Sequence, residues 1–244
     1  YFQLFSRCYY YFPSTLNDSD WKILLKCRIR KQRLDYLKFR CKNECENLKE
    51  FAKDEQREES LRCLRSMIID PYPTLAIDCR FLSFLSPRAL SLTLLQIRYL
   101  IANNNSRQFP WPIYLCNVNF NDENLVEAFS KLINVEITFL NYTKIFSPSR
   151  IIYLSPHANE ELKKISGNEV FILGGIVDRV QEHGIHPQAS LVAAKEDNVV
   201  VQKLPLNKYI DLKAGLPYLT LTSVSSILYD AYSSRGDWHS SIQR

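Results

Sequence analysis

A single carboxylate, Asp178, has the position in this sequence that best suits chemistry. It follows the apolar segment 170–173 and the pair Gly174-Gly175. Paired glycines let a backbone approach a ligand closely or adopt a positive φ, and in open parallel sheets ligands bind beyond the carboxyl ends of the strands. An acid in such a place can equally form a turn or cap a helix. Position alone therefore leaves Asp178 either a ligand-facing group or a turn residue.

Basic side chains are concentrated in residues 22–42. Nine Lys or Arg stand there against one acid, Asp35, a net charge of +8, while the whole chain carries +5 and its remainder therefore −3. Such a block indicates a polyanionic partner, with nucleic acid as the first candidate, although a solvated helix face is the alternative. The candidate RNA-binding residues of this block are Lys22, Lys26, Arg28, Arg30, Lys31, Arg33, Lys38, Arg40 and Lys42.

Several common catalytic motifs are missing from the sequence. A Gly-x-Gly-x-x-Gly motif, a P-loop and a Gly-x-Ser-x-Gly elbow do not occur, and Gly184 is the next glycine after Gly175. His183 and His186 lie in a polar stretch that is typical of a surface loop. The seven cysteines include no Cys-x-x-Cys pair, which favours free thiols in a reducing compartment over a disulfide framework. Their spacing predicts no metal site.

The chain divides into two parts of different residue pattern, and these parts must position the groups named above. Its 244 residues are 46% hydrophobic, enough to fill a core, and no run approaches the roughly 20 apolar residues of a spanning helix. Asp18-Ser19-Asp20 can begin a helix, and residues 21–65 contain no Pro or Gly, so we expect one long helix or two stacked helices. Pro71 and Pro73 mark a boundary. We therefore predict an irregular segment 1–19, a basic helical arm 20–70 and a domain 73–244.

The predicted domain alternates strand and helix patterns. Short apolar segments at 74–79, 113–118, 135–140, 151–154, 169–173 and 199–204 are typical of buried strands. Helix patterns lie between or after them, at 87–104, 121–132, 189–196 and 222–234. This alternation predicts an α/β fold around a mostly parallel sheet.

Six segments of this domain, taken in order, resemble the tRNA purine-9 N1-methyltransferases. The most characteristic is Gly174-Gly175-Ile176-Val177-Asp178-Arg179, directly after its strand. Together the six span about residues 74–232. The other five are Ile77-Asp78-Cys79, the helix from Ser91 to Gln96-Ile97, Ile152-Tyr153-Leu154-Ser155, the loop 204–209, and Leu219-Thr220-Leu221-Thr222.

The resemblance implies the SPOUT fold, a parallel α/β sheet whose C-terminal segment threads a trefoil knot, here preceded by the long basic helical arm. It also implies S-adenosyl-L-methionine as cofactor, bound largely by backbone groups. By this resemblance the cofactor-binding residues are Leu154, Ser155, Gly174, Gly175, Ile176, Val177, Leu204, Leu206 and Thr220.

The resemblance further implies a catalytic role for Asp178. Guanine N1 bears a proton that must leave when a methyl group arrives, so a nearby carboxylate can act as general base. Adenine N1 has a free lone pair and needs only orientation. The implied activity is N1-methylation of guanine or adenine at position 9 of tRNA. Gln96 and Arg107 are further candidates for RNA contacts, and Gln96 alternatively caps a buried backbone group.

Some residues depart from the cytosolic members of the family. Segment 180–184 is not basic, Tyr99 replaces an Arg, and Asn104-Asn105 replaces an Asn-Arg pair. The long N-terminal helix and the loop 204–209 are more similar to the mitochondrial branch, the methyltransferase subunit of protein-only mitochondrial ribonuclease P. That branch implies a place in the mitochondrial matrix and no membrane association. Its implied partners are tRNA and precursor tRNA, a short-chain dehydrogenase scaffold subunit and a nuclease subunit.

Two other interpretations stay open. The chain could be a catalytically silent SPOUT-fold scaffold that binds RNA and presents precursor tRNA to a nuclease. It could also be an α/β domain with a coiled-coil arm that binds only protein. The chain starts at Tyr1 rather than Met, so we expect a processed form or a fragment.

Overall fold

The structure, a computed structural model, describes residues 13, 16–44, 48–68, 73–176, 185–210 and 218–243. The chain forms two compact units, Tyr1–Glu58 and Glu59–Arg244. No helix among the described residues is both long and apolar enough to cross a membrane. Among the described residues before position 73, the helices are α2 (Asp18–Lys26), α3 (Arg30–Glu44) and α4 (Leu48–Ile68).

In the described part of the first unit, the capped helix α2 is tied to α3. The side chain of Asn17 accepts a hydrogen bond from the Asp20 amide, and the Asp20 carboxylate accepts one from the Asn17 amide, which forms a capping box. The Tyr36 hydroxyl donates to Asp20 over 2.7 Å, and Arg40 Nε lies 2.9 Å from the same carboxylate. Because Cys27 is extended, with φ −68° and ψ 115°, α2 and α3 are separate helices, and of the two predicted alternatives the single long helix is wrong.

The second unit is built on a six-stranded sheet with the order β3-β2-β1-β5-β4-β6. All neighbouring strands are parallel, which confirms the predicted α/β class. Parallel strands direct their carboxyl ends to one edge of the sheet, where ligands bind in such folds. The strands are β1 (Thr74–Asp78), β2 (Ile113–Cys116), β3 (Glu136–Ile137), β4 (Ile151–Leu154), β5 (Val170–Gly174) and β6 (Val200–Gln202).

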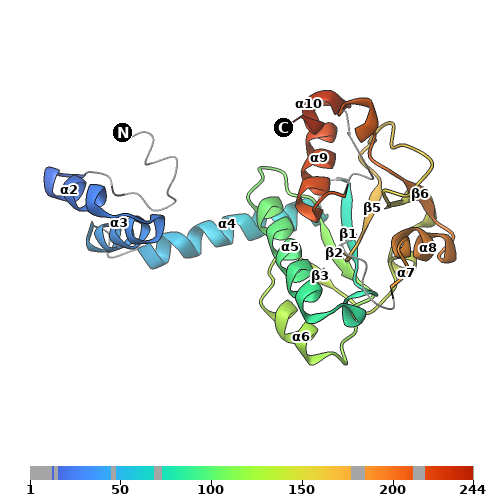
Figure 1. Ribbon diagram of the computed structural model, residues 1–244, viewed down its shortest axis with the longest axis horizontal. Helices are drawn as coiled ribbons and strands as arrows, with labels where there is room; N and C mark the ends of the chain where they lie inside the picture. The colour runs from blue at the N-terminus through green and yellow to red at the C-terminus, as the bar shows by residue number, and fades with distance from the viewer. Residues whose placement is uncertain are drawn as a thin grey trace. The chain divides into compact units, whose positions relative to one another are not determined.

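Helices cover both faces of the sheet (Figure 1). In β1, Leu75 and Ile77 pack toward α5, α6, α9 and α10, whereas Ala76 packs toward α7 and α8. Both faces are buried, so the strands are continuously apolar rather than alternating. The helices are α5 (Pro87–Asn105), α6 (Glu123–Ser130), α7 (Tyr142–Ile145), α8 (Ala189–Glu196), α9 (Leu221–Ser233) and α10 (Trp238–Ile242).

Most of the predicted elements of this unit are confirmed, with differences at short elements. Helices α7 and α10 were not predicted, because four or five residues are too few to show helical periodicity. Strand β3 is two residues long instead of the predicted six. The predicted trefoil knot depends on the paths of residues 177–184 and 211–217, which lie outside the described residues, so it stays a prediction.

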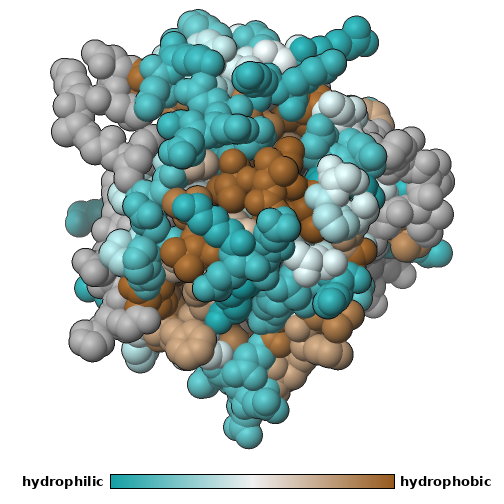
Figure 2. All heavy atoms as spheres, turned by 90° about the vertical axis from the view of Figure 1, so that its right-hand side faces the viewer, coloured by the Kyte–Doolittle hydropathy of each residue, from teal (hydrophilic) through white to brown (hydrophobic). Residues whose placement is uncertain are grey.

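One edge of the sheet is formed by β6, whose Val200 is 52% exposed. Figure 2 looks at the molecule from the side on which α8 and β6 lie and shows apolar side chains gathered near the middle of that face, with polar ones around them. Near the C-terminus of the chain, Trp238 of α10 is buried, and its indole N–H donates to the Lys163 carbonyl over 3.1 Å. Trp238 therefore serves packing.

Candidate functional site

A cavity of about 520 Å³ opens at the carboxyl ends of β4, β5 and β6. It extends to Gln96 of α5 and to the first residues of α9. Seven of the nine residues predicted to bind a cofactor line it, although they come from four separate segments of the chain. These seven are Leu154, Ser155, Gly174, Ile176, Leu204, Leu206 and Thr220.

The two glycines after β5 form a tightly packed corner at this cavity. The Gly175 amide donates to the Asp78 carbonyl over 2.9 Å. A Cβ at Gly175 would lie 2.9 Å from that same oxygen, closer than side-chain carbons come, so only glycine fits there. Gly174 lines the cavity, whereas Gly175 is buried behind it. Val177 and Asp178, which follow this corner, lie outside the described residues.

Several polar side chains line the cavity, and some of them are hydrogen-bonded to other groups of the protein. The hydroxyls of Ser155 and Ser190 lie 3.1 Å apart, and both residues are buried. Gln96 Oε1 accepts a hydrogen bond from the Leu221 amide over 3.1 Å and so ties α5 to the first residue of α9. This is the backbone-capping role that the sequence left as the alternative for Gln96, and its RNA contact stays a prediction. Thr220 is the N-cap of α9.

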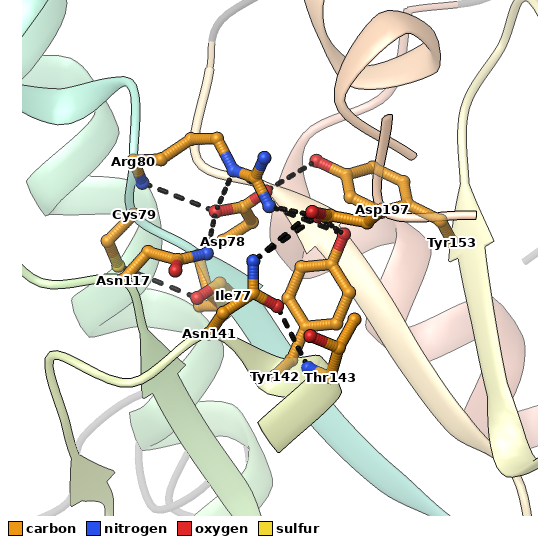
Figure 3. Close-up of polar contacts among 10 residues, drawn as sticks. All are labelled: Ile77, Asp78, Cys79, Arg80, Asn117, Asn141, Tyr142, Thr143, Tyr153 and Asp197. Carbon is orange, nitrogen blue, oxygen red and sulfur yellow. Dashed lines mark hydrogen bonds and ion pairs between the residues drawn. The ribbon is translucent and has the colours of Figure 1, made fainter. Parts of the chain in front are cut away.

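A polar cluster lies under the glycine corner, at the carboxyl end of β1 (Figure 3). At its centre the fully buried Asp78 carboxylate accepts hydrogen bonds from Asn117 Nδ2 over 2.8 Å and from the Tyr153 hydroxyl over 3.2 Å. Arg80 Nε lies 3.0 Å from one carboxylate oxygen and 2.8 Å from the other. Burial raises the pKa of Asp78, and the charge of Arg80 offsets part of that rise.

The outer half of the cluster joins the start of α7 to Arg80 through Asp197, at the end of α8. Its carboxylate accepts hydrogen bonds from the Tyr142 hydroxyl and from Arg80. The side-chain Nδ2 of Asn141, which is the N-cap of α7, lies 3.3 Å from the same carboxylate. Burial alone would raise the pKa of Asp197, but the hydrogen bonds from Tyr142 and Arg80 outweigh it and lower the pKa.

The other predicted RNA-binding residues are distributed over both units. Arg107 lies with its guanidinium 3.8 Å from the centre of the Tyr229 ring and donates to Ser226 over 3.2 Å, so it is engaged with α9. In the arm, Arg33 donates to the Cys27 carbonyl over 3.1 Å, and Arg40 pairs with Asp20. The side chains of Arg30 and Lys42 are outside the described part. The exposed members are Lys22, Lys26, Arg28, Lys31 and Lys38.

The asparagines that depart from the family pattern have structural roles. Asn104 accepts from the Trp111 amide and donates to the Trp111 carbonyl, both over 2.9 Å. Asn105 accepts a hydrogen bond from the Cys63 thiol of α4 over 3.4 Å. These contacts hold the start of β2 and the end of α4 against α5.

Some residues of the site were not predicted. Ser190 and Lys203 line the cavity, but no local motif marks either of them. Asp78 and Arg80 were not predicted to be part of the site, although the sequence shows a carboxylate at the end of an apolar strand and an arginine two positions later. Across the described positions, no group of three or more His, Cys, Asp or Glu could hold a metal ion.

Two curated relatives carry names that refer to tRNA or ribonuclease P. The mitochondrial ribonuclease P protein 1 homolog of Drosophila melanogaster is 23% identical over 180 residues, which cover 70% of this chain and 39% of that protein. The human tRNA methyltransferase 10 homolog C is 25% identical over 176 residues, which cover 69% of this chain and 42% of that protein. The chain thus spans about two fifths of the length of these curated relatives.

A solved structure, the full-length spTrm10 in complex with SAH, aligns with 72% of this chain and 97% of its own, at a TM-score of 0.56 and 19% identity. This likeness shows that the two share the α/β fold. The family model described as tRNA (guanine(9)-N(1))-methyltransferase TRM10/TRM10A matches residues 15–244, which is nearly the whole chain. The family resemblance of the sequence motifs is thereby confirmed, and the chain belongs to the TRM10/TRM10A tRNA (guanine(9)-N(1))-methyltransferase family.

Proposed function

We propose that this protein methylates N1 of the purine at position 9 of tRNA, with S-adenosyl-L-methionine as methyl donor. The observation that carries the proposal is the cavity beyond β4, β5 and β6, lined by seven residues to which the family motifs pointed. Membership of the family supports the reaction and its substrate.

The cavity fits the proposed cofactor in size and chemistry. About 520 Å³ lies within the range of roughly 300–1,000 Å³ that small-molecule sites occupy. Leu154, Leu204 and Leu206 provide apolar walls for a nucleoside and an aliphatic chain, while Ser155 and Ser190 provide hydroxyls. Bound there, S-adenosylmethionine would supply an electrophilic methyl group. The complex of spTrm10 with SAH supports this choice of ligand.

Asp178 is our proposed general base, on the strength of the family motif and of its place three residues beyond the glycine corner. With guanine as substrate it would take the N1 proton. With adenine it would only orient the base by accepting from a neighbouring donor. The family description names guanine, and we propose adenine as a second substrate.

We further propose a mitochondrial location and a role in tRNA 5′ processing. The name of the fly relative, a mitochondrial ribonuclease P protein 1 homolog, supports this branch. In this proposal the chain binds precursor tRNA together with a short-chain dehydrogenase scaffold and presents it to the nuclease subunit of mitochondrial ribonuclease P. Sharing the RNA surface with a partner agrees with the lack of a basic loop at 180–184.

Calorimetry and a methylation assay together test the proposal. The chain, alone and with the dehydrogenase, is titrated with S-adenosylmethionine and then incubated with tRNA transcripts that carry guanine or adenine at position 9. We expect cofactor binding and a methyl group at N1 of position 9. Absence of cofactor binding in both settings contradicts the proposal. Binding of cofactor and tRNA without methylation would instead favour the catalytically silent scaffold.

The basic arm should make tRNA binding strongly dependent on salt. Replacing Lys22, Lys26 and Lys31 with Gln should lower the slope of log K against log salt by roughly 2, because each phosphate contact contributes about 0.7–0.9. Fluorescence anisotropy with labelled tRNA at several salt concentrations measures this slope.

The matched control replaces three exposed lysines of the second unit, Lys131, Lys144 and Lys195, with Gln. Lys131 is the C-cap residue of α6, whereas Lys144 and Lys195 lie on α7 and α8. Replacing these three should leave the slope within about half a unit. Equal slopes for the two triple variants would show that the arm has no special part in RNA binding.

A further inference from the structure

The polar cluster under the glycine corner reaches the wall of the cavity through one hydroxyl group. The Tyr153 oxygen would lie 3.4 Å from a Cβ at Gly174, and Gly174 lines the cavity. Tyr153 is fully buried, so its hydroxyl does not touch the contents of the cavity directly. Any influence of this tyrosine on a bound ligand therefore passes through the backbone of Gly174.

Asp78 holds the same corner from two sides. Its main-chain carbonyl accepts the Gly175 amide over 2.9 Å, and its carboxylate accepts the Tyr153 hydroxyl over 3.2 Å. The carboxylate is in turn fixed by Arg80 and by Asn117, whose own backbone has a positive φ of 56°. Asn tolerates this left-handed conformation better than most residues do. The glycine corner is therefore bonded to Asp78, and the position of Asp78 is fixed by Arg80, Asn117 and Tyr153 from three places in the chain.

A buried network of this kind contributes little to the free energy of unfolding, but it restricts the geometry of the residues that form it. Taking two carboxylates and one guanidinium out of water costs free energy that their attraction only partly returns, and apolar replacements are often as stable. Satisfied hydrogen bonds in a medium of low dielectric constant do, however, restrict the geometry of each member. The cluster thus offers the glycine corner a rigid base.

We propose that Asp78 and Tyr153 are positioning residues that set the Gly174 wall of the cofactor cavity. The proposal rests on the proposed function, because it assigns the cavity to S-adenosylmethionine. Both residues act through the Gly174-Gly175 backbone, without contact to cofactor or substrate. Loss of the Tyr153 hydroxyl should let this wall shift and so weaken cofactor binding, while the groups that carry out methyl transfer stay in place.

Two matched variants test this proposal, Tyr153→Phe and Tyr142→Phe. Both tyrosines are fully buried, belong to the same cluster and lose one hydroxyl. The Tyr142 hydroxyl binds Asp197 at the far end of the cluster from the corner. We expect similar losses of thermal stability. Calorimetry should show a Kd for S-adenosylmethionine roughly tenfold higher in Tyr153→Phe alone, the size of effect that loss of one hydrogen bond has on an equilibrium.

Steady-state kinetics separates positioning from a general structural defect. In Tyr153→Phe the KM for S-adenosylmethionine should rise with the Kd, while kcat at saturating cofactor and tRNA stays within about twofold. Equal effects of the two variants on Kd, or no effect of Tyr153→Phe, would overturn the positioning role. A wild-type chain that binds no S-adenosylmethionine would instead contradict the proposed function itself, so the two failures are distinguishable.

Discussion

Replacing Asp178 with Asn should lower the rate of guanine-9 methylation by roughly two to four orders of magnitude, the usual contribution of a general base. An amide cannot accept the N1 proton, but its size preserves the corner, so binding of S-adenosylmethionine and tRNA should stay within about twofold. Single-turnover methylation with guanine at position 9 measures the rate, and calorimetry measures binding. With adenine at position 9 the loss should be smaller, because adenine N1 carries no proton to remove.

The control for this variant is Glu127→Gln, an equally conservative change at an exposed carboxylate of α6. Glu127 pairs with Lys131, four residues away, and such surface pairs contribute little. The Glu127→Gln variant should methylate at the wild-type rate. Wild-type methylation of guanine by Asp178→Asn would show that another group accepts the proton.

Replacing Arg80 with Met should lower the free energy of unfolding of the second unit by about 3–5 kcal/mol near neutral pH, because it leaves the Asp78 charge buried without its cation. Met fills much of the same volume, so the loss is mainly electrostatic. Urea denaturation at several pH values measures it. Arg98→Met, at an exposed position on the same unit, is the control and should change stability by less than about 0.5 kcal/mol.

The loss in Arg80→Met should depend on pH with a definite sign. Burial already raises the pKa of Asp78, and removal of Arg80 raises it further. An acid whose pKa is higher in the folded state binds its proton more tightly there, so the variant regains stability as pH falls through that raised pKa toward the ordinary value of 3.8.

The titration of Asp197 also makes the stability difference between the wild type and Arg80→Met smaller as pH falls. Arg80 helps to hold the pKa of Asp197 low in the wild type, and the stability this contributes is present at neutral pH and lost as pH falls. The gap between wild type and variant should therefore be widest near neutral pH and narrow in acid. A gap that stays constant from neutral pH into acid would mean that the loss does not come from the charges of Asp78 and Asp197.

The sequence alone determined the elements and the family. Continuous apolar runs and helix caps are local properties, so β1, α5, β5 and α9 could be predicted within about two residues of their observed ends. The motif residues around Gly174 and Leu204 marked where a ligand cavity would form, because the backbone approach they permit is a property of the segment itself. Family motifs, rather than periodicity, indicated tRNA methylation.

Only the tertiary structure decided which residues support that cavity. Asp78, Tyr142, Tyr153 and Asp197 are up to 119 positions apart in the chain, and no local pattern predicts that they share hydrogen bonds. The break between α2 and α3 likewise follows from Asp20 binding Tyr36 and Arg40, which pair only after the chain has turned. Contacts of this kind depend on where the strands end in space, and that is set by packing of the whole sheet rather than by neighbouring residues.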